Sequence, residues 1–469
     1  MTRLRALVCA MFALLLTVPC FALEKQPAAE YHTRRVALAE KLKGGAALIF
    51  AADEPKEEYL SWRQDEDFYY LTGWNEPGAA LLIEAAVPAA PAAYLSPAAP
   101  AERYREILFL PTRNARMERY TGVKLGADTA GAPGVAGVDE VLPITQLPHE
   151  LDRMSKAVGI IGYLNPRVSK LYAATDEPQT NATLALLAAS LGVSVPPAQE
   201  LRSVVAQLRW NKSPDELALL RKASNASIAA HRALFAAIKP GASERTMSGL
   251  VDYKLKENGC ERPSYPSIVG SGANSTVLHY SADENIMQAG DLVVVDAAGE
   301  YSMYASDVTR TFPVSGHFTP RQREIYEIVL GAQRAAMAAF VSGRSYMGSR
   351  NAPNNADSLD KIAFDYINTH GKDLHGQPLG QYFIHGLGHS VGIDVHDPYD
   401  YTKPFGPGAV FTIEPGIYIP EEKIGVRIED TFYVDANGKL MDFIADLPHT
   451  PEEVEAAMKP QAVNASKNH

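Results

Sequence analysis

The segment 291–311, DLVVVDAAGEYSMYASDVTRT, constrains the fold most, because it predicts a β-hairpin that carries two acidic side chains. Its apolar start is typical of a buried strand, and a glycine-containing reversal leads into a returning strand. We expect the turn to be centred between Tyr301 and Ser302. That register places Asp296 directly opposite Asp307, with their Cβ atoms ~5 Å apart, where like charges destabilise the pair. A divalent cation bound between the two carboxylates is the simplest way to remove this repulsion.

The segment 408–434, GAVFTIEPGIYIPEEKIGVRIEDTFYV, repeats this pattern near the C-terminus. A turn at Glu421-Glu422 would bring Glu414 opposite Glu429. Arg427 shares the strand face of Glu429, so we expect it to pair with a carboxylate that binds the metal, without binding the metal itself. Two hairpins that each offer a carboxylate pair to one centre predict a site for two metal ions.

A glycine- and histidine-rich segment, FIHGLGHSVGIDVHDP, lies between the two hairpins and contains His385, His389 and His396. Its glycines argue against a long regular helix and allow the backbone to approach a ligand closely. One imidazole added to four carboxylates makes an oxygen-rich site, which favours Mn²⁺, Co²⁺ or Fe²⁺, with Zn²⁺ as a further option. Two metal ions in such a site lower the pKa of a shared water towards neutrality, which suits hydrolysis of a carbonyl compound.

Each of these acidic residues and histidines also has a structural interpretation when it is taken alone. A single aspartate on a strand is usually a turn or edge residue, and a lone histidine is usually a core or surface side chain. Structural ion pairs explain the joint pattern poorly, because few basic residues flank the hairpins; Arg310 and Arg427 are the exceptions.

The length of 469 residues indicates two domains, since it exceeds what one hydrophobic core usually supports. The net charge of −11 argues against a nucleic-acid surface. Residues 1–22 combine Arg3 and Arg5, a short apolar run and a small-residue end, and we interpret them as a signal peptide. An uncleaved anchor is the alternative, but the run is too short to span a bilayer comfortably. If the signal is cleaved, Cys260 is the one cysteine that stays, and a buried structural thiol suits it best.

The domain organisation follows from composition and helix-start signals. We expect a signal peptide at 1–22, an α/β domain at 23–200, an α+β domain at 201–455 and a disordered tail at 456–469. A helix at 31–42 and a strand at 46–50 open the first domain, and a second helix is expected at 180–191. Three capping boxes with proline at the first helical position mark helix starts in the second domain: Ser213, Thr319 and Thr450.

These residues together resemble the metallopeptidases of the pita-bread fold, and among them the aminopeptidase P family. The segments that carry the resemblance are RQDEDFYYLTGWNEP in the first domain and IVGSGANSTVLHY, VVDAAGEYSMYASDVTRTFPVSG, HGLGHSVGIDVHD, TIEPGIYI and GVRIED in the second. The resemblance implies that two metal ions, Mn²⁺ before Co²⁺ or Zn²⁺, are held by Asp296, Asp307, His389, Glu414 and Glu429.

The same resemblance implies roles for the remaining candidate residues. Glu414 would also act as the general base, while His279 and His396 would contact the substrate and stabilise the developing oxyanion. His385 would line the pocket, and Tyr418 and Arg427 would support the ligands. The implied catalytic set is Glu414, His279, His385, His396 and Arg427, and the implied substrate contacts are His279, His385, His396 and Tyr418.

The implied reaction is release of the first residue of a peptide whose second residue is proline. That bond is a tertiary amide that lacks an N–H, so ordinary peptidases handle it poorly. An Xaa-Pro dipeptidase shares every ligand and is the nearest alternative. Methionine aminopeptidases lack the large first domain, creatinase-like enzymes have lost the ligands, and a non-catalytic pita-bread binding protein would not need them.

The signal peptide and the resemblance also make predictions about where the protein acts and how it assembles. We expect an exported protein, periplasmic or secreted, that has no membrane association after signal cleavage. The partners that we expect are peptides with proline at position two, and no nucleic acid. The family resemblance implies a homodimer or a homotetramer.

Overall fold

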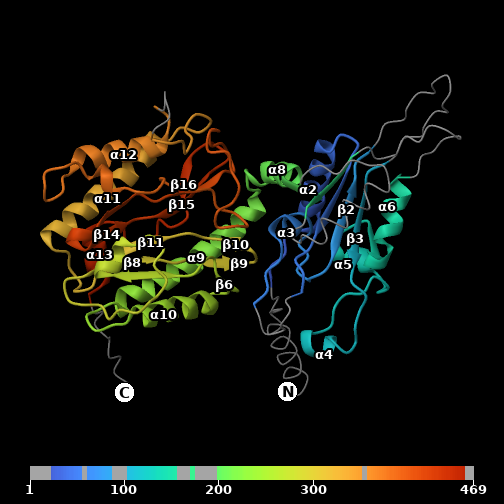
Figure 1. Ribbon diagram of the computed structural model, residues 1–469, viewed down its shortest axis with the longest axis horizontal. Coiled ribbons are helices and arrows are strands. Elements are labelled where there is room, and N and C mark those ends of the chain that lie inside the picture. Colours follow the sequence, from blue (N-terminus) through green and yellow to red (C-terminus); the bar gives the residue numbers. More distant parts are fainter. Residues whose placement is uncertain are drawn as a thin grey trace, which may run out of the picture.

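Two lobes make up the chain in the computed structural model, which describes residues 23–54, 61–86, 103–155, 170–174, 198–350 and 356–459 (Figure 1). Helix α8 (Ala198–Arg209) lies where the lobes meet. The predicted signal peptide, the predicted helix at 180–191 and residues 460–469 of the predicted tail lie outside the described ranges.

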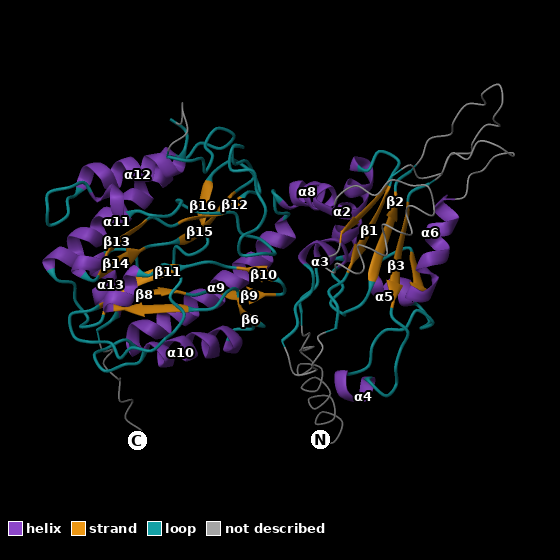
Figure 2. Cartoon of the chain, viewed as in Figure 1, coloured by secondary structure: helices purple, strands orange, loops and turns teal. Residues whose placement is uncertain are grey.

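The first lobe is built on a mixed sheet of five strands among its described residues, in the order β4-β3-β2-β1-β5 (Figure 2). Its elements before α8 are, in chain order, α2 (Ala28–Lys41), β1 (Ala46–Phe50), α3 (Glu66–Thr72), β2 (Ala80–Glu84), β3 (Arg105–Leu110), α4 (Glu118–Thr121), α5 (Ala132–Ala136), β4 (Glu140–Pro143), η1 (Ile144–Gln146), α6 (Leu147–Ser155) and β5 (Leu171–Ala174). Strand β1 runs antiparallel to β2 and parallel to β5. The predicted α/β class of this domain is confirmed.

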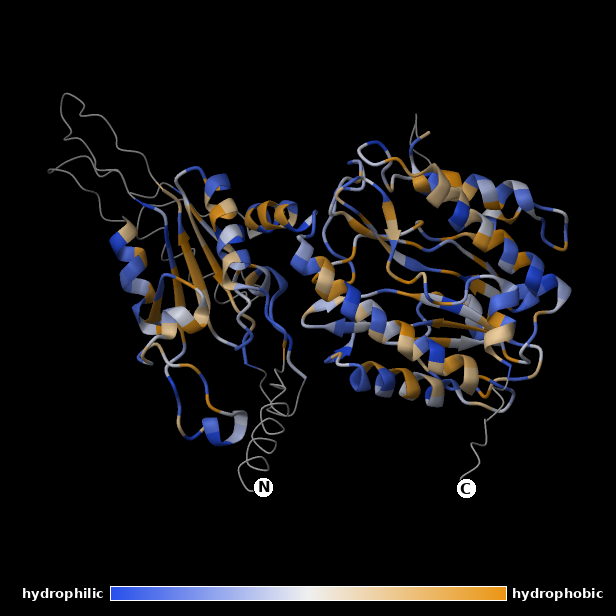
Figure 3. Ribbon diagram, turned by 180° about the vertical axis from the view of Figure 1, so that it is seen from behind, coloured by the Kyte–Doolittle hydropathy of each residue, from blue (hydrophilic) through white to orange (hydrophobic). Residues whose placement is uncertain are grey.

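Alternating side chains of this sheet pack on its two faces, as the period of a β-strand requires. On β1, Ala47 and Ile49 join the core that includes Leu38 of α2, while Ala46 and Leu48 face Leu151 of α6. The sheet is therefore buried on both sides. Figure 3 shows its strands in the colours of apolar residues, with polar residues on the outer sides of the helices.

Antiparallel strands lie between helices in the second lobe (Figure 1). Its elements are α9 (Pro214–Ala237), α10 (Glu244–Glu257), β6 (Arg262–Pro263), β7 (Ile268–Ser271), η2 (Gly272–Thr276), β8 (Leu292–Asp296), β9 (Gly299–Tyr301), β10 (Tyr304–Ala305), β11 (Thr309–Pro313), α11 (Pro320–Ala339), α12 (Leu359–His370), η3 (Leu379–Tyr382), β12 (Val410–Ile413), β13 (Gly416–Ile419), η4 (Pro420–Glu422), β14 (Ile424–Arg427), β15 (Asp430–Val434), β16 (Leu440–Asp442) and α13 (Pro451–Ala457). Helices α9 and α10 pack on β6, β7, β9 and β10, whereas α11 packs on β12, β13 and β14. This arrangement matches the α+β class expected for the second domain.

The three predicted capping boxes are all present in the structure. Ser213, Thr319 and Thr450 each accept a hydrogen bond from the backbone N–H three residues later, and that residue's side chain accepts one in return. Each box satisfies N–H groups that a helix start otherwise leaves without partners. These local signals were therefore sufficient to place the starts of α9, α11 and α13.

The second hairpin has the predicted register. Ile413 pairs with Asp430 and Gly416 with Arg427, so Glu414 lies opposite Glu429 between these pairs. Helix η4 forms its turn at the predicted position.

The first hairpin differs from the prediction by two residues. Asp296 pairs with Thr309, and not with Asp307. The reversal occurs at Ser302 and Met303, which both have positive φ angles of 51° and 71°. Such a pair suits the two-residue loops of tight hairpins, and it moves the turn one residue later than expected. Because a shift of two residues preserves the strand face, Asp296 and Asp307 still point to the same side.

Charged side chains bind the first lobe to the second. Arg209 of α8 donates to Asp67 of α3 at 2.7 Å and to Asp397 at 2.6 Å. Lys212 donates to the other oxygen of Asp397 at 3.0 Å. Asp397 follows the predicted site residue His396 in the chain, so this network attaches the first lobe to the edge of the site.

None of the helices in the described part of the chain combines the length and the apolar character that crossing a bilayer requires.

Candidate metal centre and active site

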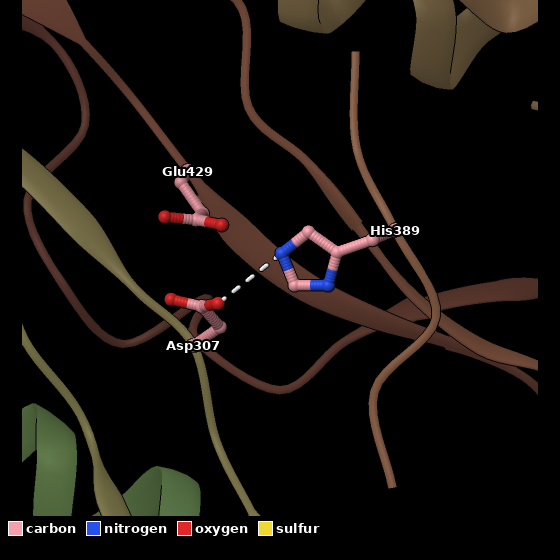
Figure 4. Close-up of side chains that lie close together, drawn as sticks. All are labelled: Asp307, His389 and Glu429. Carbon is pink, nitrogen blue, oxygen red and sulfur yellow. Dashed lines mark ion pairs between the residues drawn. The ribbon is translucent and has the colours of Figure 1, made fainter. Parts of the chain in front are cut away.

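Asp307, His389 and Glu429 lie together in the second lobe, with potential ligand atoms all within 4.8 Å of one another. Figure 4 shows the two carboxylates and the imidazole directed at a common point. His389 Nε2 is 3.3 Å from an oxygen of Asp307. Asp307 follows β10, Glu429 lies between β14 and β15, and His389 belongs to the irregular segment before β12. Three distant parts of the chain therefore meet here.

Glu414 and Asp296 extend this group to the five residues predicted as ligands. His389 Nε2 is also 3.3 Å from Glu414 Oε1. The Tyr265 hydroxyl donates to Asp296 at 2.6 Å and lies 2.5 Å from Asp307. The structure thus brings together all four carboxylates of the two hairpins and the one imidazole.

Three carboxyl groups in this cluster, those of Asp307, Glu414 and Glu429, hold their protons more firmly than free ones do. Burial, reinforced by the neighbouring carboxylates, raises the pKa of Asp307 and raises that of Glu429 well above its ordinary value. Burial likewise raises the pKa of Glu414 to about 7. A concentration of buried acidic groups with raised pKa values is the electrostatic signature of a site that accepts protons or cations.

His389 is oriented as a ligand would be. Its Nδ1 lies 3.2 Å from the backbone carbonyl of Ser390, which can only accept, so Nδ1 carries the hydrogen. Nε2 then faces Asp307 and Glu414. Burial lowers the pKa of His389, but Asp307 and Glu414 outweigh burial and raise it to about 9. A metal ion would replace the Nε2 proton, with Nδ1–H fixed by the backbone as is usual for ligating histidines.

A chain of hydrogen bonds leads from the cluster to His385. Arg427 donates to Asp296 at 2.6 Å and to the Tyr418 hydroxyl at 2.9 Å. That hydroxyl lies 2.8 Å from His385 Nε2, while His385 Nδ1 lies 2.8 Å from the carbonyl of Gly386. Because the carbonyl accepts, Nδ1 donates to it and Tyr418 donates to Nε2. Burial lowers the pKa of His385 to about 4, so the ring is neutral at pH 7.

A cavity of about 220 Å³ opens above the cluster. Its lining residues are Leu278, His279, Asp296, His385, Gly386, Gly388, His389, Glu414 and Arg427. His396 is not in this lining, but its ring packs on His389 with centroids 4.2 Å apart. Tyr418, Asp307 and Glu429 are also not in this lining, but Tyr418 contacts the lining residues His385 and Arg427, and Asp307 contacts His389.

The loop with His385 and His389 has no helix or strand to hold it, and side chains from elsewhere do so. Asp360 of α12 accepts the N–H of Leu387 at 3.0 Å and pairs with Arg350, which donates to the carbonyl of Phe383 at 2.7 Å. On the other side, a Cβ at Gly388 would lie 2.2 Å from the carbonyl oxygen of Thr412. The expected close approach of the backbone is thus real at Gly388.

Some residues of the site were not anticipated from the sequence. Tyr265 bridges two carboxylates, Thr309 donates to Glu429 at 2.6 Å, and Thr412 donates to Glu414 at 3.0 Å. Thr309 and Thr412 lie within the hairpin strands two residues from Asp307 and Glu414, so the period-two pattern could have identified them. Nothing in the sequence distinguishes Tyr265 from any other tyrosine near a strand. The expected partner of Arg427 was a ligand carboxylate, and the structure shows that it is Asp296.

A second group of potential ligands, Asp430, Asp442 and His449, lies close by. Arg310 pairs with Asp430 at 2.7 Å and the His449 ring lies 2.8 Å from it. Arg310 and His449 together outweigh burial and lower the pKa of Asp430. Its charge is already compensated, so this group is a structural ion pair.

Comparisons with known proteins agree with this geometry. Residues 218–436 match the model of metallopeptidase family M24, and residues 31–160 match the aminopeptidase P N-terminal domain. An Xaa-Pro aminopeptidase of Escherichia coli is 34% identical over 448 residues, which are 92% of this chain and 97% of that protein. An Xaa-Pro dipeptidase of Pyrococcus furiosus is 39% identical over 245 residues, 51% of this chain and 65% of the relative.

Solved structures show the same similarity over the whole fold. Proline aminopeptidase P II of Yersinia pestis superimposes with a TM-score of 0.76 at 30% identity, covering 92% of this chain and 99% of the other. A substrate complex of an Escherichia coli aminopeptidase P variant superimposes with a TM-score of 0.77 at 30% identity, covering 93% of this chain and 99% of that one.

Proposed function

This chain belongs to metallopeptidase family M24 and is an Xaa-Pro aminopeptidase-like hydrolase, and we propose that it releases the first residue of peptides with proline at position two, using two divalent metal ions. The observation that carries the proposal is the convergence of Asp296, Asp307, His389, Glu414 and Glu429 beneath a cavity. The two bound ions would polarise the substrate carbonyl and supply an activated water, as two-metal hydrolases do.

The residues of the cluster fit a pair of divalent cations. Four carboxylates bring up to four negative charges, and Arg427 is the one arginine or lysine among the residues that line the cavity. The raised pKa values of Asp307, Glu414 and Glu429 mean that protons occupy this site when metal does not. We propose Mn²⁺ as the native metal, since oxygen-rich sites with one imidazole favour it, with Co²⁺ or Zn²⁺ as substitutes.

Glu414 is the residue that we assign to proton transfer. Thr412 donates to its Oε1, and its Oε2 lies 3.9 Å from His385 Nδ1 on the side of the cavity. A pKa of about 7 suits a group that takes up and releases a proton near neutral pH. We assign substrate contact to His279, which lines the cavity, and to His396, whose ring packs on His389.

Arg427 helps to separate aminopeptidase activity from dipeptidase activity. Its guanidinium donates to Thr309, Tyr418 and Asp296, so each of its three nitrogens already has a protein partner and its charge is paired with Asp296, while two of its five N–H groups have no further partner among these three. A dipeptide would present its carboxylate just beyond proline, where a free cation would be required. This arrangement supports the aminopeptidase assignment, while the similarity to an Xaa-Pro dipeptidase keeps the second activity as the alternative.

The decisive experiment compares three substrate classes on the purified protein with added Mn²⁺. Ala-Pro-Ala should be hydrolysed much faster than Ala-Pro, and Met-Ala-Ser should be almost inert. A chelator should abolish the activity, and Mn²⁺ or Co²⁺ should restore it. Preferential cleavage of Ala-Pro would assign a dipeptidase, and full activity in a metal-free preparation would refute the metal assignment.

Export and assembly are further parts of the proposal. The charged, apolar and small-residue regions of 1–22 support removal of a signal peptide and a periplasmic or secreted location. N-terminal sequencing of the mature protein should find a start near Leu23, and an intact Met1 would contradict export by cleavage. Resemblance to the family supports a dimer or a tetramer, which light scattering of the purified protein will measure.

A further inference from the structure

Glu244, the first residue of α10, is a fully buried carboxylate outside the metal cluster that receives an unusual number of hydrogen bonds. Its Oε1 accepts the backbone N–H and the hydroxyl of Ser271, both at 2.7 Å, and the Asn274 amide at 3.2 Å. Its Oε2 accepts the hydroxyl of Tyr280 at 2.9 Å and the backbone N–H of Asn285 at 2.8 Å. Both oxygens are therefore saturated with donors.

All of these donors come from one loop, residues 271–285, which connects β7 to the strand β8 that carries Asp296. This loop contributes Leu278 and His279 to the cavity lining. Only the short helix η2 gives it regular structure, so side-chain contacts determine its path. Tyr280 is bonded to Glu244 and adjoins His279 directly.

A second contact holds the same loop against the metal-binding hairpin. The N–H of Gly425 in β14 donates to the Ser275 hydroxyl at 2.9 Å. A Cβ at position 425 would lie 1.9 Å from the Ser275 carbonyl oxygen, so only glycine permits this approach. The loop is thus fixed at both ends while His279 between them remains exposed.

The hydrogen bonds to Glu244 are of the strong, charge-assisted kind. Burial tends to raise the pKa of Glu244, but the N–H groups of Asn285 and Ser271 and the two hydroxyls outweigh burial and lower it. The carboxylate is consequently ionised at neutral pH. Bonds to an ionised acceptor are roughly twice as strong as those between neutral groups, and a negative charge at the start of a 14-residue helix is favourable as well.

We propose that Glu244 is a positioning residue that fixes the 271–285 loop so that His279 is held against the bound peptide. This inference rests on the proposed peptidase function and adds a residue that touches neither metal nor substrate. Rates of positioned reactions fall by up to about 100-fold when a contact group moves by about 1 Å. Loss of the Glu244 charge should therefore lower kcat/KM strongly.

The test is a double-mutant cycle between Glu244 and His279. Glu244→Gln preserves the size of the side chain but replaces one acceptor oxygen with an NH₂ group. The hydrogens of that group face hydrogen-bond donors of the loop and cannot accept from them. We expect kcat/KM for Ala-Pro-Ala to fall by about tenfold to 100-fold, with bound Mn²⁺ per chain unchanged. In the His279→Ala background the same substitution should add almost nothing, because coupled residues are not additive.

A matched control lies on the same helix. Glu257 at the other end of α10 accepts hydrogen bonds from Tyr253 and Lys254 of the same helix, so Glu257→Gln should leave kcat/KM unchanged. An equal loss from Glu244→Gln with and without His279 would overturn the inference, as would a lower melting temperature with unchanged kcat/KM.

Tyr280→Phe covers the case in which Glu244→Gln fails to fold. It removes one donor at the half-buried end of the network, so we expect a loss of about fivefold that vanishes with His279→Ala. If the wild type hydrolyses no peptide at all, the proposed function fails, and the cycle is then measured as binding of Ala-Pro-Ala by calorimetry. Hydrolysis by the wild type with no coupling in the cycle would instead overturn only the role of Glu244.

Discussion

Arg427 Nη2 donates a hydrogen bond of 2.6 Å to Asp296 Oδ2, across the space between the two hairpins that carry the predicted metal ligands. Arg427 is buried, and the positive charge lies against a cluster of four carboxylates. The neighbouring tyrosine and carboxylates outweigh burial and raise the pKa of Arg427 well above its ordinary value, so the guanidinium stays charged. This ion pair thus joins the two hairpins, as the pair of Arg310 with Asp430 also does, and it orients a predicted ligand.

Replacing Arg427 with Met should destabilise the protein, because Asp296 and Tyr418 lose their buried donor. Removal of one partner from a buried pair costs about 3–5 kcal/mol. Urea unfolding of the metal-free protein will measure this change in the free energy of unfolding. Arg113→Met, at an exposed arginine paired with Glu118, is the control and should have no measurable effect; equal stability of the two variants would contradict the assigned role.

Tyr265→Phe should weaken metal binding. The Tyr265 hydroxyl contacts both Asp296 and Asp307, and it orients them on one side of the site. Loss of such a supporting contact typically reduces metal affinity by about 10–100-fold. Calorimetric titration with Mn²⁺ will show this, with Tyr253→Phe on the exposed side of α10 as the control. Unchanged affinity in Tyr265→Phe would show that the hydroxyl does not organise the ligands.

Glu414→Gln should reduce kcat by about 10²–10⁴-fold, since an amide of the same shape accepts no proton. The fold should be preserved, because Thr412 still finds an acceptor oxygen. The control is Glu421→Gln, at the exposed turn of the same hairpin. Kinetics on Ala-Pro-Ala at saturating Mn²⁺, with bound metal measured in parallel, will separate lost proton transfer from lost metal; near-normal kcat would exclude Glu414 as the base.

Stabilisation by Mn²⁺ should increase with pH. Burial raises the folded-state pKa of Glu414 from 4.5 to about 7, so its contribution to stability is complete below pH 4.5 and is lost as the pH rises through 7. Asp307 and Glu414 outweigh burial and raise that of His389 from 6.5 to about 9, so its contribution is lost as the pH rises through 9. Metal must displace these protons, and each displaced proton contributes about 1.4 kcal/mol per pH unit.

Thermal unfolding with and without Mn²⁺ at several pH values will test this linkage. The increase in melting temperature that Mn²⁺ produces should be larger at pH 8 than at pH 6. In Glu414→Ala the dependence on pH should shrink, because one of the displaced protons is gone. An equal increase at both pH values in the wild type would mean that metal does not bind at the protonated cluster.

The sequence alone determined those features whose causes are local. The capping boxes at Ser213, Thr319 and Thr450 needed only the residues of one helix start. The opposition of Glu414 and Glu429 followed from period-two patterning about a short turn. The first hairpin was predicted with the turn one residue early. The two residues with positive φ angles are Ser302 and Met303, and neither is a glycine or an asparagine, so the sequence does not indicate the position of the turn.

Only the tertiary structure decided which side chains from distant segments support the site. Tyr265 meets two carboxylates across the sheet, and Glu244 collects donors from residues 27 to 41 positions away. Hydrogen bonds of this kind depend on how helices and strands pack, and no spacing in the sequence encodes that packing. The local pattern of the sequence therefore predicts the ligands, whereas the groups that orient them can be identified only from the packing of helices and strands in the tertiary structure.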